Sequence, residues 1–212
     1  CQETSIKRIR LSSIEPIEFT DELLSFVASE ERIADYYHIP LQSGSDSVLA
    51  RMNRPYRSYL FRDVINKISR AIPTAGIGTD IIAGFPGESE SEFDETVKLV
   101  SDLPLSNMHV FPYSIRPGTK AASMKDQITN NIKKERIKIL REIRIQKKHN
   151  FYRSYIGKTQ RYIIDQYNSG DGVFSGTSSN YVQCKIINCS LKVGNEYDLT
   201  GEKIEGEYLI CS

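Results

Sequence analysis

The stretch Tyr37–Asp46, YHIPLQSGSD, is where the fold of this 212-residue chain can be predicted from sequence. An apolar run at 36–41 ends in polar residues at 42–46, and from Ser47 onward apolar residues recur at helical spacing. A short apolar run followed by a helical period is typical of a strand, a loop and a helix. We therefore expect a strand whose carboxyl end opens into a polar loop.

Five polar or small residues form this loop. Gln42 and Ser43 are expected to direct hydrogen-bonding side chains into the space beyond the strand. Gly44 predicts a sharp turn, because glycine adopts backbone conformations that other residues avoid. Ser45 or Asp46 can cap the new helix. An ordinary capped loop has the same pattern, so the loop alone does not identify a site.

The order of strand, polar loop and helix recurs along the first part of the chain. The expected strands are 6–11, 36–41, 77–83 and 106–113, and the expected helices are 21–28, 59–71 and 89–100. Each helix fits a crossover, so parallel strands covered by helices are expected, either as a barrel or as an open doubly wound sheet. There is no GxGxxG motif, so a dinucleotide site on an open sheet lacks support.

Polar side chains lie on or just after each expected strand. They are Ser12, Ser13, Glu15, Gln42, Ser43, Asp80, Glu88, Tyr113 and Arg116. In βα barrels the chemistry lies at the carboxyl ends of the strands, so this recurrence predicts a binding site at one edge. His38 and His109 lie within apolar strands, and we interpret them as barrel residues rather than ligands.

Residues 130–155 predict a long helix with an excess of positive charge. Nine Lys or Arg side chains face only two Glu, and an apolar stripe runs along the same segment. The pattern is compatible with a solvated face or with a surface that contacts phosphates.

After Gly157 short apolar runs alternate with turn residues. The expected strands are 160–166, 172–177, 180–187, 196–199 and 206–210. Five short strands in this space predict a small all-β, OB-like barrel. The predicted organisation is an α/β part at 1–129, a basic connecting helix at 130–155 and a β-barrel at 156–212.

Composition sets few limits on function. Lys plus Arg (28) nearly equals Asp plus Glu (27), so net charge indicates no class of partner. No apolar run approaches the roughly 20 residues of a membrane helix, which predicts no membrane association. Four scattered cysteines suit a reducing compartment, and we predict the cytoplasm. The chain begins at Cys1 and is expected to enter a strand almost at once, so we interpret it as part of a longer protein.

Several long motifs in order resemble the radical S-adenosylmethionine (SAM) tRNA methylthiotransferase family. They are RLSSIEP (10–16), HIPLQSGSD (38–46), GTDIIAGFPGE (78–88) and HVFPYSIRPGT (109–119). The stretches GKTQRYIID (157–165) and GTSSNYVQCKI (176–186) are similar to a TRAM domain. The SSIEP and VFPYS runs favour the branch that modifies threonylcarbamoyladenosine in tRNA over the branches that modify isopentenyladenosine or a ribosomal protein.

The resemblance implies a fold, cofactors and a reaction. The fold would be a partial, TIM-like βα barrel, of which this chain supplies the last four of six strands, followed by a TRAM barrel. The cofactors would be SAM on a [4Fe–4S] cluster and a second [4Fe–4S] cluster in a preceding domain. The reaction would replace a C–H bond of the base by C–S–CH3, with one SAM cleaved to a radical and another supplying methyl. The implied partner is the tRNA anticodon stem-loop.

The cysteines that would hold the radical cluster are missing from this chain. The family motif CxxxCxxC does not occur, and Cys184 and Cys189 have the wrong spacing and lie in the expected β-barrel. We therefore assign no catalytic residue and no metal ligand here, and we predict that the chain is inactive alone.

The resemblance also implies roles for the polar strand ends. We assign to cofactor binding Ser13, Gln42, Ser43, Asp80, Glu88, Tyr113 and Arg116. Gln42 and Ser43 are expected at the ribose or amino-acid part of SAM, and Asp80 or Glu88 at its ammonium group or in a supporting salt bridge. Arg116 would bind a carboxylate, of SAM or of the threonyl group, with its two-pronged guanidinium.

RNA contacts are expected from the basic helix and the barrel. The candidates are Lys133, Lys134, Arg141, Arg144, Tyr162 and Tyr181, the cations for phosphates and the rings for unpaired bases. Residues 156–212 carry five basic and seven acidic side chains, which keeps a basic ribosomal protein as an alternative substrate. A non-enzymatic RNA-binding module is a second alternative. A βα enzyme acting on a phosphorylated molecule is a third, but Pro117–Thr119 matches a phosphate loop poorly.

Overall fold

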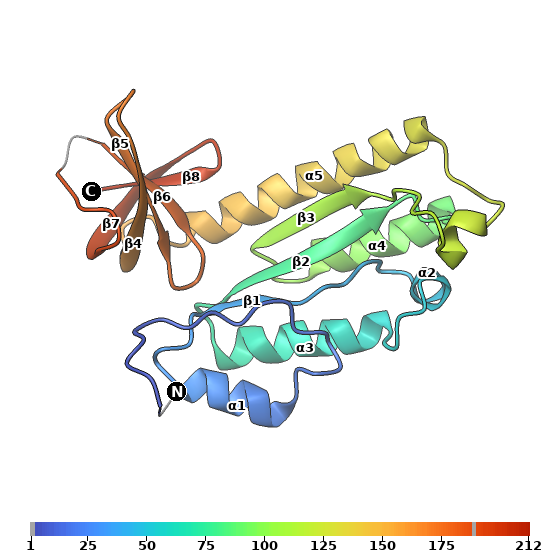
Figure 1. Ribbon diagram of the computed structural model, residues 1–212, viewed down its shortest axis with the longest axis horizontal. Coiled ribbons are helices and arrows are strands. Elements are labelled where there is room, and N and C mark those ends of the chain that lie inside the picture. The colour runs from blue at the N-terminus through green and yellow to red at the C-terminus, as the bar shows by residue number, and fades with distance from the viewer. Residues whose placement is uncertain (1–2, 188–189) are drawn as a thin grey trace.

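An α/β part and a β-barrel are joined by one long helix (Figure 1). The structure is a computed structural model that describes residues 3–187 and 190–212. The helices are α1 (Asp21–Ser29), α2 (Asp46–Arg51), α3 (Ser58–Ala71), α4 (Glu90–Asp102), η1, a 3-10 turn (Lys120–Ser123), and α5 (Asn130–Arg153). The strands are β1 (Tyr36–His38), β2 (Gly76–Ala83), β3 (Asn107–Pro112), β4 (Thr159–Asn168), β5 (Val173–Ser178), β6 (Gln183–Ile186), β7 (Glu196–Glu205) and β8 (Tyr208–Cys211).

The α/β part contains a three-stranded parallel sheet in the order β1-β2-β3. Helices α3 and α4 cover one face, and α5 runs along the edge strand β3 (Figure 1). Alternate residues of the strands, such as Ile77, Ile81 and Met108, are buried among these helices. Since side chains alternate across a strand, Asp80 and His109 lie on the opposite, open face. The parallel order is as predicted, whereas closure into a TIM-like barrel stays a prediction.

The prediction of a first strand at 6–11 is wrong. Among the described residues of 6–16, only Ile9 forms a bridge, with Ile33, and Ile14 N donates to His38 O at 3.1 Å. Ser13 has φ 52°, which breaks extended backbone, and Arg8 turns its side chain to Glu196 in the barrel. The sheet therefore has three strands where four were expected.

Strand β1 is shorter than predicted because of Pro40. Proline has no N–H, so the ladder with β2 is interrupted there. Leu41 N donates instead to the Thr79 hydroxyl at 3.0 Å, and Gln42 rejoins β2 through a bridge to Ile81. The extended course of 36–42 is thus kept without regular pairing.

Side-chain caps begin α1, α3 and α4, whereas the N-cap residues of α2 and α5 make no such bond. Thr20 accepts from Leu23 N at the start of α1, and Ser89 forms a reciprocal capping box with Glu92 at the start of α4. Asp46, expected to cap α2, accepts from Ser58 N at 2.7 Å and so caps α3. The first residue of α2 thereby links two consecutive helices.

The C-terminal residues form a closed barrel in the order β4-β5-β6-β8-β7, which confirms the five-stranded all-β prediction. All neighbours are antiparallel except β6 and β8. Its core includes Tyr162, Ile164, Val182 and Cys184. The division of the chain at 129 and 155 stays a prediction, as does the assignment of the barrel to the TRAM type. Cys1 and Cys189, two of the cysteines considered above, lie outside the described residues.

The barrel packs against the amino-terminal end of the sheet. Asn180 Nδ2 donates to Thr74 O at 2.9 Å, and a Cβ on Gly76 would lie 2.1 Å from Asn180 O. Strand β2 has eight residues, about 25 Å at roughly 3.3 Å per residue. The carboxyl end of the sheet is therefore on the far side from the barrel.

Candidate functional site

A cleft of about 530 Å³ lies at the carboxyl end of the sheet, where the strand pattern predicted a site. It is lined by Gln42, Asp80, Ile82, Phe85, Phe111, Pro112, Tyr113, Ser114, Arg116, Thr119 and Ala121. Four of the seven predicted cofactor residues are among them. The volume is within the range of ligand pockets, which are usually apolar with a few polar groups.

Gln42 enters the cleft from a strained backbone. Its φ is 67°, in the left-handed region that costs a non-glycine residue of order 1–3 kcal/mol. Its N–H donates to Asp80 O at 2.8 Å and its carbonyl accepts from Ile82 N at 2.9 Å. These bonds to β2 hold the strained conformation, and no described residue hydrogen-bonds the side-chain amide. The turn expected at Gly44 is therefore made by Gln42.

Ser43 and Ser13 do not line the cleft. Ser43 is fully buried, and its hydroxyl lies 3.3 Å from the Thr96 hydroxyl on α4. It also accepts from Ser45 N at 3.2 Å, so it organises the loop. Ser13 is exposed and is not among the lining residues. Neither position supports direct contact with a ligand in this cleft.

Glu88 is used inside the fold rather than in the cleft. It is 2% exposed, and its Oε2 accepts from Gly84 N at 2.7 Å and from Arg136 Nη1 at 2.6 Å. Burial raises the pKa of Glu88 above its ordinary value, although both contacts oppose that rise. The carboxylate connects the loop after β2 to α5. Glu88 therefore forms a supporting salt bridge, with Arg136, which was one of the two roles expected for it.

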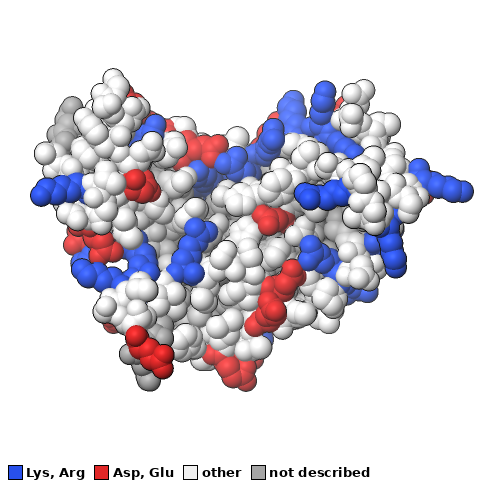
Figure 2. All heavy atoms as spheres, viewed as in Figure 1, with Lys and Arg blue, Asp and Glu red and all other residues white. Residues whose placement is uncertain are grey.

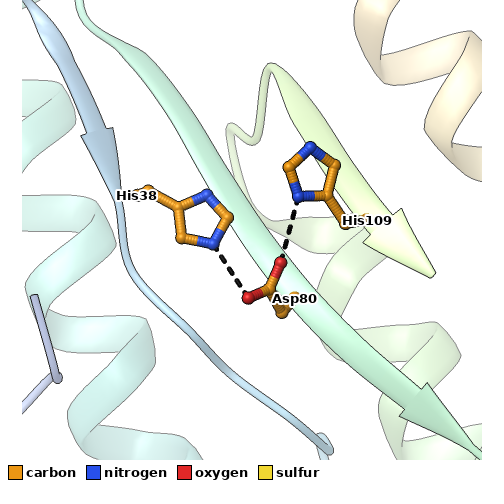
Figure 3. Close-up of side chains that lie close together, drawn as sticks. All are labelled: His38, Asp80 and His109. Carbon is orange, nitrogen blue, oxygen red and sulfur yellow. Dashed lines mark hydrogen bonds and ion pairs between the residues drawn. The ribbon is translucent and has the colours of Figure 1, made fainter. Parts of the chain in front are cut away.

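Asp80 lies between two histidines on the open face of the sheet (Figure 3). His38 Nε2 is 3.0 Å from Asp80 Oδ2, and His109 Nδ1 is 3.1 Å from Asp80 Oδ1. Burial works against ionisation of Asp80, but its contacts with both imidazoles hold the pKa of the carboxyl below its ordinary value. Both carboxylate oxygens are therefore occupied, and His38 and His109 belong to one polar cluster.

Tyr113 and Arg116 lie in the cleft as predicted. Tyr113 Oη is buried without a hydrogen-bond partner among the described residues, and its ring contacts Phe85 edge-on at 5.3 Å. Arg116 is exposed, and within 3–187 and 190–212 its guanidinium has no acidic partner. An unpartnered hydroxyl and a free guanidinium beside aromatic rings suit a ligand with an aromatic and an anionic part.

Three cleft features were missed by the sequence analysis. Phe111 was not singled out, although alternation along β3 from His109 puts it on the open face. Phe85 was considered only within the motif GTDIIAGFPGE (78–88). The 3-10 turn η1, which contributes Ala121, has no strong sequence signal because such turns are short.

The basic helix α5 is less exposed than its charge suggests. Lys133, Arg136 and Lys148 are buried, and Lys133 Nζ donates to Tyr113 O at 3.0 Å. Arg144 donates to Asn107 Oδ1 at 3.2 Å and pairs with Glu207 of the barrel. Lys147 Nζ also donates to Ser101 O and to Leu103 O, so five of the nine basic side chains support the fold.

Three exposed cations of α5 border a groove. Lys134, Lys138 and Arg141 lie with Pro112, Ile137, Glu142 and Ile145 around a space of about 400 Å³. Figure 2 shows basic side chains gathered along the rim of the molecule formed by α5. We call Lys134, Lys138 and Arg141 the basic ridge.

The two predicted base-stacking tyrosines serve the structure. Tyr162 is fully buried in the barrel core, which leaves no ring face for a base. Tyr181 stacks on Tyr36 with ring centroids 4.5 Å apart, and the guanidinium of Arg10 lies 4.2 Å from the Tyr181 ring centre. This stack joins the barrel to β1, and we carry neither tyrosine forward as a base contact.

Comparisons with known proteins concern the family of the chain. Residues 2–100 match the Radical SAM superfamily. The chain is 44% identical over 163 residues to the threonylcarbamoyladenosine tRNA methylthiotransferase MtaB of Aquifex aeolicus, covering 77% of this chain and 40% of the relative. It is 39% identical to the Bacillus subtilis protein of that name, over 84% of this chain and 40% of the relative.

A second group of relatives is named for a different nucleoside. The tRNA-2-methylthio-N(6)-dimethylallyladenosine synthase of Clostridium botulinum is 32% identical, over 94% of this chain and 47% of the relative. The chain therefore spans less than half the length of the curated relatives it matches.

A solved structure and the helix lengths complete the comparison. Coproporphyrinogen III oxidase (HemN) of Escherichia coli, a radical SAM enzyme, matches with a TM-score of 0.53 and 23% identity, over 64% of this chain and 32% of that one. This likeness concerns the fold alone. Of the helices described here, none has the apolar length that crossing a membrane requires.

Proposed function

We propose, from the premise that this chain belongs to the radical SAM methylthiotransferase family, that it forms part of an enzyme that methylthiolates an adenosine in tRNA. The substrate would be threonylcarbamoyladenosine beside the anticodon. The relatives named for that nucleoside are 44% and 39% identical, and the dimethylallyladenosine enzymes of Pseudomonas aeruginosa and Clostridium botulinum are 38% and 32% identical. The cleft at the carboxyl end of the sheet would be the reaction site.

The cleft residues fit SAM. Tyr113, Phe85 and Phe111 offer ring surfaces for a purine, and the Gln42 amide is available for a ribose or amino-acid group. SAM, when bound, supplies a methyl group and, on reductive cleavage, a carbon radical. Asp80 and Glu88 are left out of this set because both carboxylates already have partners in the fold.

The observation that supports the substrate assignment most directly is the free guanidinium of Arg116. Threonylcarbamoyladenosine carries a carboxylate, whereas the dimethylallyl group is apolar. Arginine binds carboxylates through two parallel hydrogen bonds, and such charged pairs are stronger than neutral ones. An exposed arginine beside aromatic rings therefore favours the nucleoside with the carboxylate.

The described cysteines do not fit an iron–sulfur cluster. Cys184 and Cys211 are both buried in the barrel. The hydrogen bond with Cys211 and, after it, burial raise the pKa of the Cys184 thiol. Clusters are held by thiolates. The family's [4Fe–4S] clusters would therefore need ligands from elsewhere in the complete protein, and we assign no step to a cluster here.

We propose that tRNA phosphates contact the basic ridge. The ridge is exposed and lies beside Pro112, the last residue of β3. Pro112 also lines the cleft, so the ridge borders the proposed reaction site. The cytoplasmic location expected from the cysteine content would suit this substrate. The Arg144 and Lys133 contacts proposed from sequence are replaced by Lys138, because the first two pair within the fold.

Nucleoside titrations of the 212-residue chain test the Arg116 assignment. Threonylcarbamoyladenosine should bind about tenfold more tightly than dimethylallyladenosine, a difference of about 1.4 kcal/mol. Arg116→Ala should remove this preference and Arg116→Lys should keep part of it. Lys120→Ala, a nearby exposed cation that does not line the cleft, is the control and should keep it. A preference that survives Arg116→Ala would overturn the assignment.

A further inference from the structure

His38, Asp80 and His109 form a cluster on three adjacent strands of the sheet. His38 ends β1, Asp80 lies in β2 and His109 in β3, where it is the register partner of Asp80. All three side chains point toward one another on the open face (Figure 3). The chain has three histidines in all, and two of them are here.

We propose that these three residues bind one divalent transition-metal ion. Each offers one ligand atom, and the three atoms lie within 4.8 Å of one another. A zinc ion binds imidazole nitrogen and carboxylate oxygen at about 2.0–2.2 Å, so neighbouring ligand atoms around one tetrahedral ion are about 3.4 Å apart. The two imidazole nitrogens are already 3.0 and 3.1 Å from the carboxylate oxygens.

The two histidine side chains differ in solvent exposure, which suits a metal site with an open coordination position. The His38 side chain is 9% exposed, which fixes one ligand. The His109 side chain is 50% exposed, so its ring can rotate toward the ion and leave positions open on the solvent side. Three protein ligands with an open position are typical of catalytic rather than structural zinc sites.

The backbone around the cluster leaves room for it. A Cβ on Gly78 would lie 2.1 Å from Tyr36 Oη and 3.2 Å from His38 Nδ1. Glycine at 78 therefore admits both the Tyr36 and the His38 rings on this face. Within the described residues no Lys or Arg forms an ion pair with Asp80, so its charge is shared only by the two imidazoles.

The donor set indicates which ions fit. Two imidazoles and one carboxylate suit zinc, cobalt or ferrous iron, whereas magnesium and calcium prefer oxygen ligands alone. The iron–sulfur clusters of the family need thiolates, so this site is distinct from them. Because Asp80 also lines the cleft, an open position of the ion would face the ligand space and would accept an anionic oxygen.

Metal titration of the 212-residue chain tests this site. Accessible thiols are first blocked with iodoacetamide, and Cys184 and Cys211 are buried in the barrel core. Co²⁺ binding is then followed by visible absorption and calorimetry, with Zn²⁺ as competitor. One equivalent should bind, and the ring NMR signals of His38 and His109 should shift while that of His149 does not. His149 lies on α5 with Nε2 2.8 Å from Gly206 O, away from the cluster.

Three variants decide the ligands. His109→Ala and Asp80→Asn should each weaken binding by at least about 100-fold, since the loss of a direct ligand costs no less than the loss of a supporting group. His149→Ala is the matched control and should bind as the wild type does. His109→Ala removes an exposed ring, so the fold is expected to persist, as a thermal melt would show.

Two results would overturn the proposal. One is the absence of one-to-one binding, and the other is binding that His109→Ala and Asp80→Asn leave unchanged. The cluster would then be only a hydrogen-bonded group. No nucleoside or tRNA is used in this test, so its failure would leave the Arg116 assignment untouched.

Discussion

Gly44 packs its backbone directly against Thr96 of α4. Gly44 N donates to Thr96 Oγ1 at 2.9 Å, and a Cβ on residue 44 would lie 2.5 Å from Thr96 Cα. The φ of Gly44 is not positive, so the need for glycine is one of space and not of backbone conformation. This contact holds the loop before α2 against α4 and so places Gln42 beside the cleft.

Gly44→Ala should therefore destabilise the fold by about 1–3 kcal/mol, the range for overpacking a buried site. Thr96→Ser should not rescue it, because the closest atom is the backbone Cα. Gly170→Ala, whose Cβ would have only Asn168 Oδ1 at 3.4 Å, is the control and should change stability by less than about 0.5 kcal/mol. Urea unfolding measures all three, and equal midpoints for Gly44→Ala and wild type would contradict the packing argument.

Glu92 should make stability depend on pH. Its hydrogen bonds from Arg51, together with those from Ser47 and Ser89 N, lower the pKa of Glu92 to about 2. A carboxyl with a lowered folded pKa stabilises the fold above its unfolded pKa near 4.5, and this contribution is lost as pH falls toward 2. Glu92→Gln keeps the capping box, since Gln also serves there, but loses the charge.

The expected cost of Glu92→Gln is about 1 kcal/mol at pH 7, after allowance for screening of a partly exposed pair. The difference in stability between Glu92→Gln and wild type should become smaller below about pH 4.5. Glu95→Gln, on the exposed side of the same helix and without an ion pair among the described residues, should cost little at any pH. Thermal melts between pH 3 and 7 check this, and a gap independent of pH would exclude the charge explanation.

The basic ridge should set the salt dependence of tRNA binding. The triple variant Lys134→Ala, Lys138→Ala, Arg141→Ala should reduce the slope of log affinity against log salt by about 2, since each phosphate contact contributes roughly 0.7–0.9. The triple variant Arg62→Ala, Lys67→Ala, Arg70→Ala removes the same charge from α3, and its slope should match wild type.

Fluorescence titrations at several salt concentrations distinguish the two triple variants. Equal slopes for both would move the RNA contact away from α5. Tighter binding of a basic ribosomal protein than of tRNA would favour the alternative substrate.

The 212-residue chain should not assemble a [4Fe–4S] cluster. It lacks a CxxxCxxC motif, and its two described cysteines are buried in the barrel. Anaerobic reconstitution with iron and sulfide, followed by iron and sulfide analysis, checks this. Iron bound without sulfide would belong to the His38 cluster, whereas stoichiometric iron and sulfide with SAM turnover would contradict the prediction.

Local patterns predicted most of the elements and the cleft. Alternation and caps were enough for β2, β3, α3, α4 and the barrel strands. The expected strand at 6–11 does not form: Ile9 makes a single bridge to Ile33, and Arg8 pairs with Glu196, far along the chain. The turn was predicted at Gly44 because glycine is common in turns. In the structure the backbone hydrogen bonds with β2 hold Gln42 in the left-handed conformation that makes the turn.

Long-range pairing also explains the other misplaced residues. Glu88 and Arg136 are 48 residues apart and become buried together, which removes one from the cleft and the other from the surface. Arg144 is neutralised by Glu207 of the barrel. Helical spacing predicted which cations lie on α5, but it carries no information on which of them meet an acid.

The most direct test of the proposed function is the nucleoside content of tRNA from the source organism. Deletion of the gene that encodes this chain should abolish the methylthio form of threonylcarbamoyladenosine and leave unmethylthiolated threonylcarbamoyladenosine in its place. Any methylthio-dimethylallyladenosine should be unchanged. Mass spectrometry of digested tRNA measures all of these nucleosides. A deletion strain that retains methylthio-threonylcarbamoyladenosine at the wild-type level, or that loses only the dimethylallyl product, would contradict the assignment.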